Sequence, residues 1–297
     1  MQHATDETVL GYFGDATFYY AGIESRFYRR DNRFYVRTDG ADGQMAEFEV
    51  RYTFGVNPLQ QYLVEFPDGR LQALSIAWDS RPVKLGGQRW FHLYPNDQVN
   101  HYDSLHWTGA AQNWNSMCAD CHSTDVHLSY DAEQNRFVRR WTEISVGCES
   151  CHGPASNHVS WAREGIDVPY KGLTLLLDER RGSSWQKSLR SIAARRSKPL
   201  DTHREHEVCA QCHSRRAQIA EGYHAGLPLL DHYLPVLLEH GLYHADGQQR
   251  DETFISALFA QSRMFAAGVT FSDPIVSSCD WNTPGRAYRL QAPTISA

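Results

Sequence analysis

The sequence predicts an α+β protein with three regions: an antiparallel β-rich region in residues 1–100, a loop-rich region of mainly short helices in residues 101–270, and an atypical tail in residues 271–297. Two observations predict this organisation. Between about Ala16 and Tyr94, segments rich in aromatic and β-branched residues alternate with turn residues, which is typical of an antiparallel sheet. From about His101 onward, closely spaced cysteines and histidines replace this pattern, and the regular segments become short.

The β-rich region contains two hairpin patterns and one strongly alternating segment. In each hairpin pattern, two apolar runs flank residues that favour a turn. We expect the aromatic residues of this region to form the core and cross-strand pairs rather than a ligand site. The segments are residues 26–30 and 33–37 around Asp31 and Asn32, residues 47–54, and residues 61–66 and 71–78 around residues 67–70.

Three later segments have the apolar spacing of helices. The sequence predicts helices over residues 156–163, 184–196 and 252–267, with Gly268 ending the third. The third segment has the clearest pattern, because its apolar residues recur on one face.

Composition narrows the possible functions. The 29 basic and 35 acidic residues give a formal net charge of -6, which argues against binding to nucleic acid. No run approaches the ~20 apolar residues of a membrane span. Two counts are out of line with ordinary composition, namely 15 His and 7 Cys.

Six of the seven cysteines occur in CxxC pairs, and a histidine directly follows each pair. This pentapeptide, CxxCH, is the attachment signature of c-type haem. Three copies occur, at residues 118–122, 148–152 and 209–213, and we refer to them as the first, second and third motifs.

The spacing has a chemical reason. Residues i and i+3 project from the same side of a helical turn, so both thiols can add to the two vinyl groups of one porphyrin. The histidine at i+4 then lies under the ring and binds the iron as its proximal ligand. The sequence therefore predicts three haem c groups and assigns no catalytic residue. The predicted thioether cysteines are Cys118, Cys121, Cys148, Cys151, Cys209 and Cys212, and the predicted proximal ligands are His122, His152 and His213.

A zinc site or a thioredoxin-like dithiol is the alternative for a CxxC pair. Zinc needs two pairs, or one pair and further ligands, converging on one metal ion. Three pairs leave an odd set, and zinc gives no reason for a histidine directly after each second cysteine.

The other axial position of each iron needs a second ligand. The chain has only four Met, which favours histidine over methionine. The first distal candidate is His158, six residues after the proximal histidine of the second motif, because Gly153 and Pro154 turn the chain between them. The others are His106, just upstream of the first motif, and His244. For each of them, a hydrogen-bonded histidine beside a haem propionate is the alternative.

Haem attachment also bears on location. Thioether formation normally takes place outside the cytoplasm, so the motifs predict a periplasmic protein. Residues 1–8 are polar and acidic, with neither the basic nor the apolar region of a signal peptide. We therefore expect that the chain as given lacks its true start.

The motifs and their surroundings resemble the multihaem cytochromes c related to the tetrahaem cytochrome of ammonia oxidisers, which are often fused to tetratricopeptide repeats. The resemblance extends over nearly the whole chain to about Val269 and implies redox protein partners. Besides the three motifs, the matching segments are residues 53–56, 58–64, 88–95, 106–109 and 112–115.

Two departures from that family stand out. Its members have a further CxxCH and a signal peptide before the stretch that resembles residues 1–3, and usually another CxxCH after the stretch that resembles residues 267–270. Here residues 271–297 are unlike the family and Cys279 stands alone. We expect a fragment of a larger multihaem protein that retains three haem sites, with no haem role for Cys279.

The function that follows is electron transfer between haems that have two histidine ligands each. The first alternative is a multihaem reductase or oxidase that acts on a small nitrogen or sulfur compound at a haem with an open distal site. A sensor or assembly module is a third possibility. The cluster that could deliver protons to a substrate comprises His203, Arg204, His206, Arg215 and Arg216, although arginines beside a haem more often bind propionates.

Overall fold

The computed structural model describes residues 1–187 and 194–271. The fold is α+β, as predicted, and the chain divides into two compact units. Unit 1 comprises Met1–Thr174 and Ala220–Leu227, and unit 2 comprises the described residues of Leu175–Ile219 and of 228–271. Within the described ranges, no helix has the length and apolar character that crossing a membrane requires.

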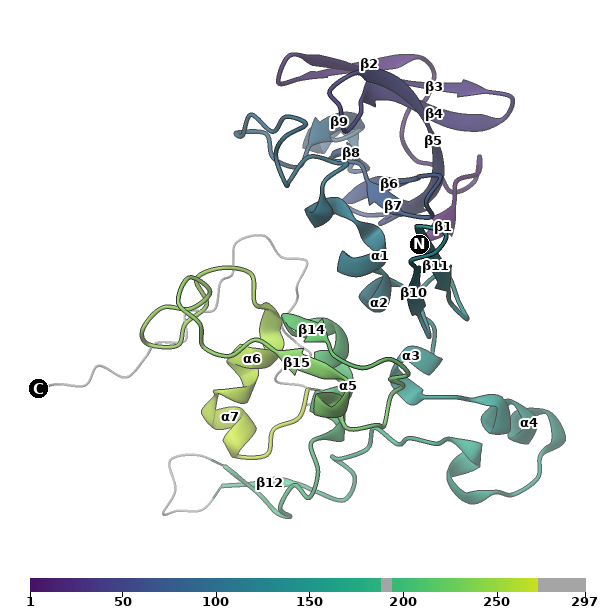
Figure 1. Ribbon diagram of the computed structural model, residues 1–297. Coiled ribbons are helices and arrows are strands. Elements are labelled where there is room, and N and C mark those ends of the chain that lie inside the picture. Colours follow the sequence, from purple (N-terminus) through teal and green to yellow (C-terminus); the bar gives the residue numbers. More distant parts are fainter. Residues whose placement is uncertain (188–193, 272–297) are drawn as a thin grey trace, which may run out of the picture. The chain divides into compact units, whose positions relative to one another are not determined.

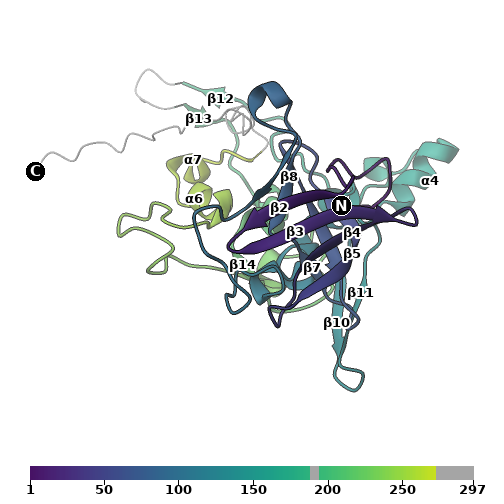
Figure 2. The ribbon, with the colours of Figure 1, turned by 90° about the horizontal axis from the view of Figure 1, so that it is seen from above.

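Unit 1 is built on one antiparallel sheet. Its described residues place nine strands in the order β2-β3-β4-β5-β6-β8-β9, with β1 paired to β5 and β7 paired to β6 (Figure 1). Seen from above, β2 to β5 lie side by side (Figure 2). The strands are β1 (Gln2–His3), β2 (Ala16–Tyr20), β3 (Ile23–Arg30), β4 (Arg33–Asp39), β5 (Met45–Phe54), β6 (Leu59–Glu65), β7 (Leu71–Ala73), β8 (Ile76–Asp79) and β9 (Arg89–His92).

Both predicted hairpins are present. Asp31 and Asn32 connect β3 to β4 with φ angles of 50° and 59°, the two positive values that a type I′ turn requires. The second hairpin joins β6 to β7, but the predicted 71–78 strand is two strands. β7 pairs with the end of β6 and β8 pairs with its beginning, and two extra residues, Leu74 and Ser75, shift the register between them.

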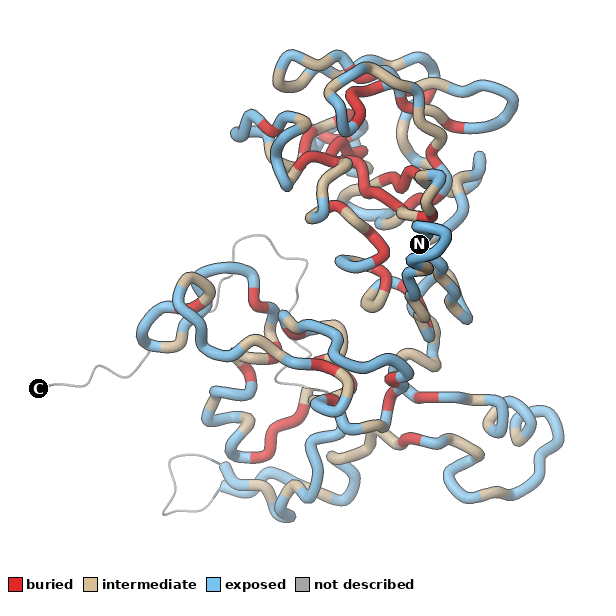
Figure 3. The backbone as a smooth tube through the Cα atoms, viewed as in Figure 1, coloured by how far each residue is buried: buried red, intermediate tan, exposed pale blue. Residues whose placement is uncertain are grey.

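The sheet curls until its edges meet. The rings of Tyr20 in β2 and His92 in β9 stack with centroids 3.5 Å apart. The prediction that aromatic residues form the core is confirmed, because they pack together inside this curl, where the buried stretches of Figure 3 follow the strands. The members of this sheet core are Phe13, Phe27, Phe34, Val36, Val50, Tyr62, Val64, Leu74, Ile76, Trp78, Trp90 and Trp107.

The rest of unit 1 consists of short elements that include the first two motifs. A second buried cluster lies here and contains side chains of β5, β6 and β7 together with Trp114 and Ala119. The predicted helix over residues 156–163 is confirmed as α4. The elements are η1 (Val83–Leu85), η2 (Ala110–Gln112), α1 (Trp114–Met117), α2 (Ala119–His122), the hairpin β10 (His127–Asp131) and β11 (Arg136–Arg140), α3 (Glu149–His152), α4 (Ser156–Glu164) and η3 (Pro169–Gly172).

Unit 2 corrects two helix predictions. The predicted helix over residues 184–196 is wrong at both described ends, where β12 and β13 pair as antiparallel strands; residues 188–193 lie outside the described residues. The predicted helix over residues 252–267 is two helices, because Ser262 accepts a hydrogen bond from the Phe265 N–H and starts a new one. The elements are β12 (Trp185–Gln186), β13 (Arg195–Arg196), α5 (Arg204–His213), β14 (Arg216–Gln218), η4 (Leu229–Asp231), β15 (Tyr233–Pro235), α6 (Phe254–Ala260) and α7 (Arg263–Ala266).

The predicted region boundaries at residues 100 and 270 remain predictions. The tail that begins at residue 271, with Cys279, lies outside the described residues except for Phe271.

Candidate haem attachment sites

All three motifs lie on helical turns. In the first two motifs the N–H of the histidine donates to the carbonyl oxygen of the first cysteine, at 3.0 Å for His122 and Cys118 and at 3.0 Å for His152 and Cys148. The third motif forms the last turn and a half of α5. The two thiols of each motif therefore project from one side of a helical turn, and the histidine follows directly. This arrangement fits a porphyrin held by two thioethers and one imidazole.

The motif side chains lie at the surface to different degrees. His122, His152 and His213 are exposed, as are Cys148 and Cys151. The other four cysteines are half-buried. A ring attached at these positions would therefore cover side chains that now face solvent.

The first motif is anchored to the sheet. Cys118 packs beside Ala119 and the fully buried Trp114 in the second cluster. The side-chain oxygen of Asn115 accepts a hydrogen bond from the Leu71 N–H at 2.8 Å, which ties α1 to β7. Burial, and then the neighbouring Cys121, raises the pKa of the Cys118 thiol to about 11. The motif thus has a rigid support and a protonated first thiol.

Thr124 connects the first motif to the second. It follows the first proximal histidine by two residues and is 2% exposed. Its hydroxyl donates to the carbonyl oxygen of Ser145 at 2.8 Å and accepts from the N–H of Gly147 at 2.8 Å. The hydroxyl of Ser150, inside the second motif, lies 2.9 Å away. One buried side chain therefore holds the two attachment segments of unit 1 together.

Beyond the second motif the chain turns, as predicted. Gly153 ends α3 at a φ of 71°, and a Cβ there would lie 2.8 Å from the Thr174 hydroxyl, so only glycine fits. The N–H of Ala155 donates to the Glu149 carboxylate at 2.7 Å, which sets the start of α4 and the direction of His158.

His158 has the protonation pattern of a metal-ligating histidine. Its Nδ1 lies 2.7 Å from the carbonyl oxygen of Lys171. A carbonyl oxygen only accepts, so Nδ1 carries the hydrogen and a neutral ring presents a lone pair at Nε2. Ligating histidines are commonly oriented through their other ring nitrogen in this way. The ring also stacks on Trp161 with centroids 5.2 Å apart.

His106 is placed differently. It is 4% exposed, and its Nε2 lies 3.1 Å from the Asp39 carboxylate while its Nδ1 lies 2.8 Å from the Thr108 hydroxyl. Because both ring nitrogens are engaged in buried contacts, this geometry favours the hydrogen-bonded alternative over iron ligation.

His244 lies in an exposed turn of unit 2. Its backbone N–H donates to the Gln248 carbonyl at 2.8 Å, and its own carbonyl accepts from the Gly247 N–H at 2.9 Å. The turn leaves the imidazole at the surface, and it remains a candidate ligand.

The third motif is supported from both ends of α5. At its start the Glu179 carboxylate accepts hydrogen bonds from the N–H groups of Arg204 and Glu205 at 2.9 and 3.3 Å. At its end the Ser214 hydroxyl donates to the Ala210 carbonyl at 2.6 Å. The buried side chains of Val208 and Ala210 fix the face of the helix that turns inward.

His206 lies three residues before Cys209 and inside an aromatic cluster. Its ring contacts Phe259, Phe265 and Phe271 with centroids 5.0 to 6.0 Å apart. Burial, and then the neighbouring His203, lowers the pKa of His206 to about 4, so this imidazole is neutral at pH 7. Its Nε2 lies 3.3 Å from the Ser256 hydroxyl, which joins α5 to α6.

The histidines and arginines of the candidate proton-delivery cluster face different elements. The rings of His203 and His206 both contact Phe265 of α7, and the His206 Nε2 also lies 3.3 Å from the Ser256 hydroxyl of α6. Arg215 donates to the Glu252 carbonyl, whereas the Arg216 guanidinium lies 3.7 Å from the centre of the Tyr233 ring. Their contacts therefore do not describe one site.

Sequence reasoning missed the residues that position the motifs. Asn115, Thr124 and Glu179 act through contacts with distant segments, and only the quoted similarity around residues 112–115 pointed to one of them. Glu179 and Thr124 have no local signal.

The side chains that could bind a metal and the comparisons with known proteins are both consistent with haem. In residues 1–187 and 194–271, no group of three or more His, Cys, Asp or Glu side chains is arranged to hold a metal ion, and a haem iron needs none because the porphyrin supplies four ligands. Searches of curated proteins and of solved structures found no match. Residues 88–153, which contain the first two motifs, match the family model described as cytochrome c554 and c-prime. This match supports a cytochrome c family for the chain, and with it covalently bound haem c and electron transfer.

Proposed function

We propose that this chain transfers electrons through three covalently attached haems in the periplasm. One observation carries the proposal: each CxxCH motif lies on a helical turn that places its thiols on one side, with its histidine directly after them. Bound haem supplies the one-electron chemistry, and the protein tunes each potential through axial ligands, burial and hydrogen bonds.

Within unit 1 the structure supports transfer between two neighbouring haems. The Thr124 hydroxyl ties residues 145–150 to the segment after the first motif, so both attachment turns are fixed to one another. Electron transfer becomes slower as the distance between redox centres grows, and a fixed short connection favours it.

The relation to the tetrahaem cytochromes of ammonia oxidisers extends the proposal. It adds redox proteins as partners, and tetratricopeptide repeats in a full-length protein of which this chain is one part. The family match over residues 88–153 supports the cytochrome portion of this relation.

The haem number is tested by expressing the chain with an exported leader in cells that attach haem. We expect an intact mass equal to the polypeptide plus three haems. Changing both cysteines of one motif to serine should remove one haem each time, whichever motif is changed. A zinc-loaded, haem-free protein would refute the proposal. A count of two would refute the number three, and the motif whose variant keeps both haems would be the unused one.

His158 is the distal ligand that the structure supports best, because its Nδ1–H is held by the Lys171 carbonyl. We expect His158→Ala to keep all covalent haem and to gain a high-spin ferric component of about one haem in three. The reduced variant should bind carbon monoxide at that haem. His127→Ala, a control in strand β10 whose ring pairs with Asp125, should leave the spectrum unchanged.

Two outcomes of this experiment would change the assignment. An unchanged low-spin spectrum in His158→Ala would leave His244 or His106 as the ligand. Carbon monoxide binding by the unmodified protein would show an open haem and favour the reductase or oxidase alternative.

A further inference from the structure

The last three residues of η3 have an unusual backbone conformation. Tyr170, Lys171 and Gly172 have φ angles of 54°, 56° and 74°, so three consecutive residues lie in the left-handed region. We refer to them as the 170–172 turn. The left-handed region is unfavourable for residues other than glycine, and such strain persists only where the surrounding structure imposes it. The contacts between this turn and α4 therefore need an explanation.

Gly172 packs directly on the backbone of α4. A Cβ at this position would lie 2.6 Å from the carbonyl oxygen of Asn157 and 2.9 Å from the backbone nitrogen of His158. The positive φ and the lack of space therefore both require glycine. Gly165, which ends α4, differs in one respect: its φ is also positive, at 67°, but a Cβ there would meet nothing within 4 Å.

Lys171 contacts His158 directly and also through a second ring. Its backbone carbonyl oxygen accepts the hydrogen bond from Nδ1 of His158 at 2.7 Å. Its ammonium group lies 5.2 Å from the centre of the Trp161 ring, which is the distance of a cation–π contact. The Trp161 ring in turn stacks on His158 with an angle of 21° between the two planes. The imidazole therefore has its Nδ1 hydrogen directed at one oxygen and one of its faces covered.

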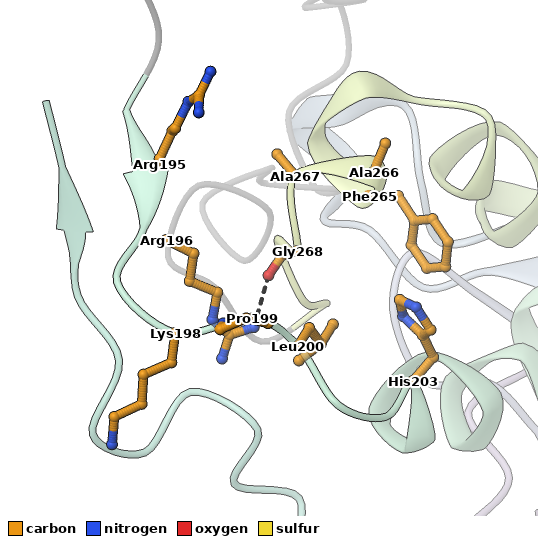
Figure 4. A pocket seen from close by; sticks show the side chains of 10 residues that line it. All are labelled: Arg195, Arg196, Lys198, Pro199, Leu200, His203, Phe265, Ala266, Ala267 and Gly268. Atoms are coloured by element: carbon orange, nitrogen blue, oxygen red, sulfur yellow. Dashed lines mark hydrogen bonds between the residues drawn. The ribbon is translucent and has the colours of Figure 1, made fainter. Parts of the chain in front are cut away.

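Stacking on an aromatic ring does not by itself give this arrangement. In the pocket that Figure 4 shows, His203 stacks on Phe265 with centroids 4.5 Å apart. Within the described parts of the chain, however, no hydrogen bond reaches the ring nitrogens of His203. A stack does not select between the two neutral tautomers of an imidazole, whereas a carbonyl oxygen does. The hydrogen bond from the 170–172 turn is thus the feature that distinguishes His158.

We propose that the 170–172 turn is a positioning device that fixes the tautomer and the ring plane of His158, so that Nε2 can bind a haem iron. Lys171 acts through its carbonyl oxygen, and Gly172 acts by letting the turn approach α4. This inference rests on the proposed function, because Nε2 has an iron to bind only when haem is attached. A hydrogen bond donated by Nδ1 makes an imidazole a stronger ligand, which favours ferric haem and lowers its potential.

The test compares Gly172→Ala with Gly165→Ala in the full chain with its haems. Both variants place alanine at a left-handed position beside α4, but only at Gly172 does the added Cβ meet the backbone of the helix. In Gly172→Ala we expect an unchanged covalent haem content and a higher potential of one haem. The affinity of the reduced protein for carbon monoxide should rise about tenfold or more. In Gly165→Ala the potentials should not change, and this affinity should change less than twofold.

Nuclear magnetic resonance with isotope-labelled histidine reports the tautomer separately from the iron bond. Reduced low-spin haem is diamagnetic, and the Nδ1–H signal of His158 is identified by its loss in His158→Ala. We expect solvent exchange of this hydrogen to become about tenfold faster in Gly172→Ala and to stay unchanged in Gly165→Ala. Lys171→Gly tests the carbonyl oxygen, because glycine accepts the same φ and keeps that oxygen, so the Nδ1–H signal should remain.

Failure of the inference can be separated from failure of the proposed function. A haem-free protein, or an unchanged low-spin spectrum in His158→Ala, would refute the haem or ligand assignment on which the inference rests. With both assignments intact, an unchanged Nδ1–H signal and unchanged potentials in Gly172→Ala would refute the positioning role. Loss of the signal in Lys171→Gly, or equal effects in Gly165→Ala and Gly172→Ala, would also refute it.

Discussion

The sheet of unit 1 and the third-motif region of unit 2 differ in how much of their apolar surface they bury. In the sheet, twelve buried side chains form one core, and Trp90 stacks on Phe27 with centroids 3.7 Å apart. In unit 2 the described buried residues form short separate stretches (Figure 3). Large apolar side chains there remain exposed, such as Leu234 at 60% and Leu237 at 77%. The sheet supplies its own core, and unit 2 lacks apolar mass that attached haem would provide.

The two motifs of unit 1 show the same contrast on a smaller scale. Cys118 of the first motif packs against a buried cluster beside Trp114, whereas Cys148 and Cys151 of the second are exposed and held mainly by hydrogen bonds around Thr124. We therefore expect the second motif to depend more on an attached haem for its order than the first motif does.

The largest effect is expected when the third haem is removed. In Cys209→Ser with Cys212→Ser, we expect nearly all amide protection in the described parts of unit 2 to be lost, while the sheet keeps its protection. The reason is that unit 2 has few buried apolar contacts of its own. Hydrogen exchange followed by mass spectrometry measures both units in one sample.

The matched variant for this comparison is Cys148→Ser with Cys151→Ser, which removes one haem from unit 1. Its sheet should stay as protected as in the unmodified protein. Full protection of unit 2 without the third haem would contradict the comparison, because it would show that unit 2 has a sufficient core.

A smaller effect is expected from the sheet core. Phe27 is fully buried and contacts Phe13 and Trp90, so Phe27→Ala should lower the free energy of unfolding by about 3–5 kcal/mol. The haem count should stay at three, because no motif residue contacts Phe27 in the sheet core. Urea denaturation followed by circular dichroism measures the loss, and Tyr19→Ala, at a 69% exposed position, should cost under about 0.5 kcal/mol.

The smallest effect concerns the buried pair of Asp39 and His106. Burial alone raises the pKa of Asp39, but the hydrogen bond and charge of His106, with a hydrogen bond from Thr38, outweigh it and hold this pKa below its usual value. A carboxylate with a lowered pKa stabilises the fold above about pH 4, and this contribution is lost as the pH falls through the folded-state pKa. We expect Asp39→Asn to cost about 1–3 kcal/mol at pH 7.

The pH dependence checks the cause of this effect. Between pH 5 and pH 2.5, the urea midpoint should fall less in Asp39→Asn than in the unmodified protein. His106→Gln should leave the haem spectrum low-spin. A high-spin component in His106→Gln would instead make His106 an iron ligand. The Asp39–His106 pair would then belong to a haem site and not to the sheet.

Local spacing was enough to predict several features from the sequence. The i, i+3, i+4 spacing of CxxCH placed each motif on a helical turn, and the Asp31-Asn32 pair marked the turn of a hairpin. The α+β class and helix α4 were also predictable. These features depend on residues within a few positions of one another, so a single segment contains the information.

Tertiary structure decided the rest. β12 and β13 pair across an intervening segment that looked helical, and the strand predicted over residues 71–78 is interrupted where its register against β6 shifts by two residues. His106 meets Asp39, 67 residues away, and Thr124 meets Ser150, 26 residues away. The sequence alone predicted which residues would carry the haem chemistry. Contacts between distant segments decided which of them are buried, paired or available, because those contacts exist only once the chain is folded.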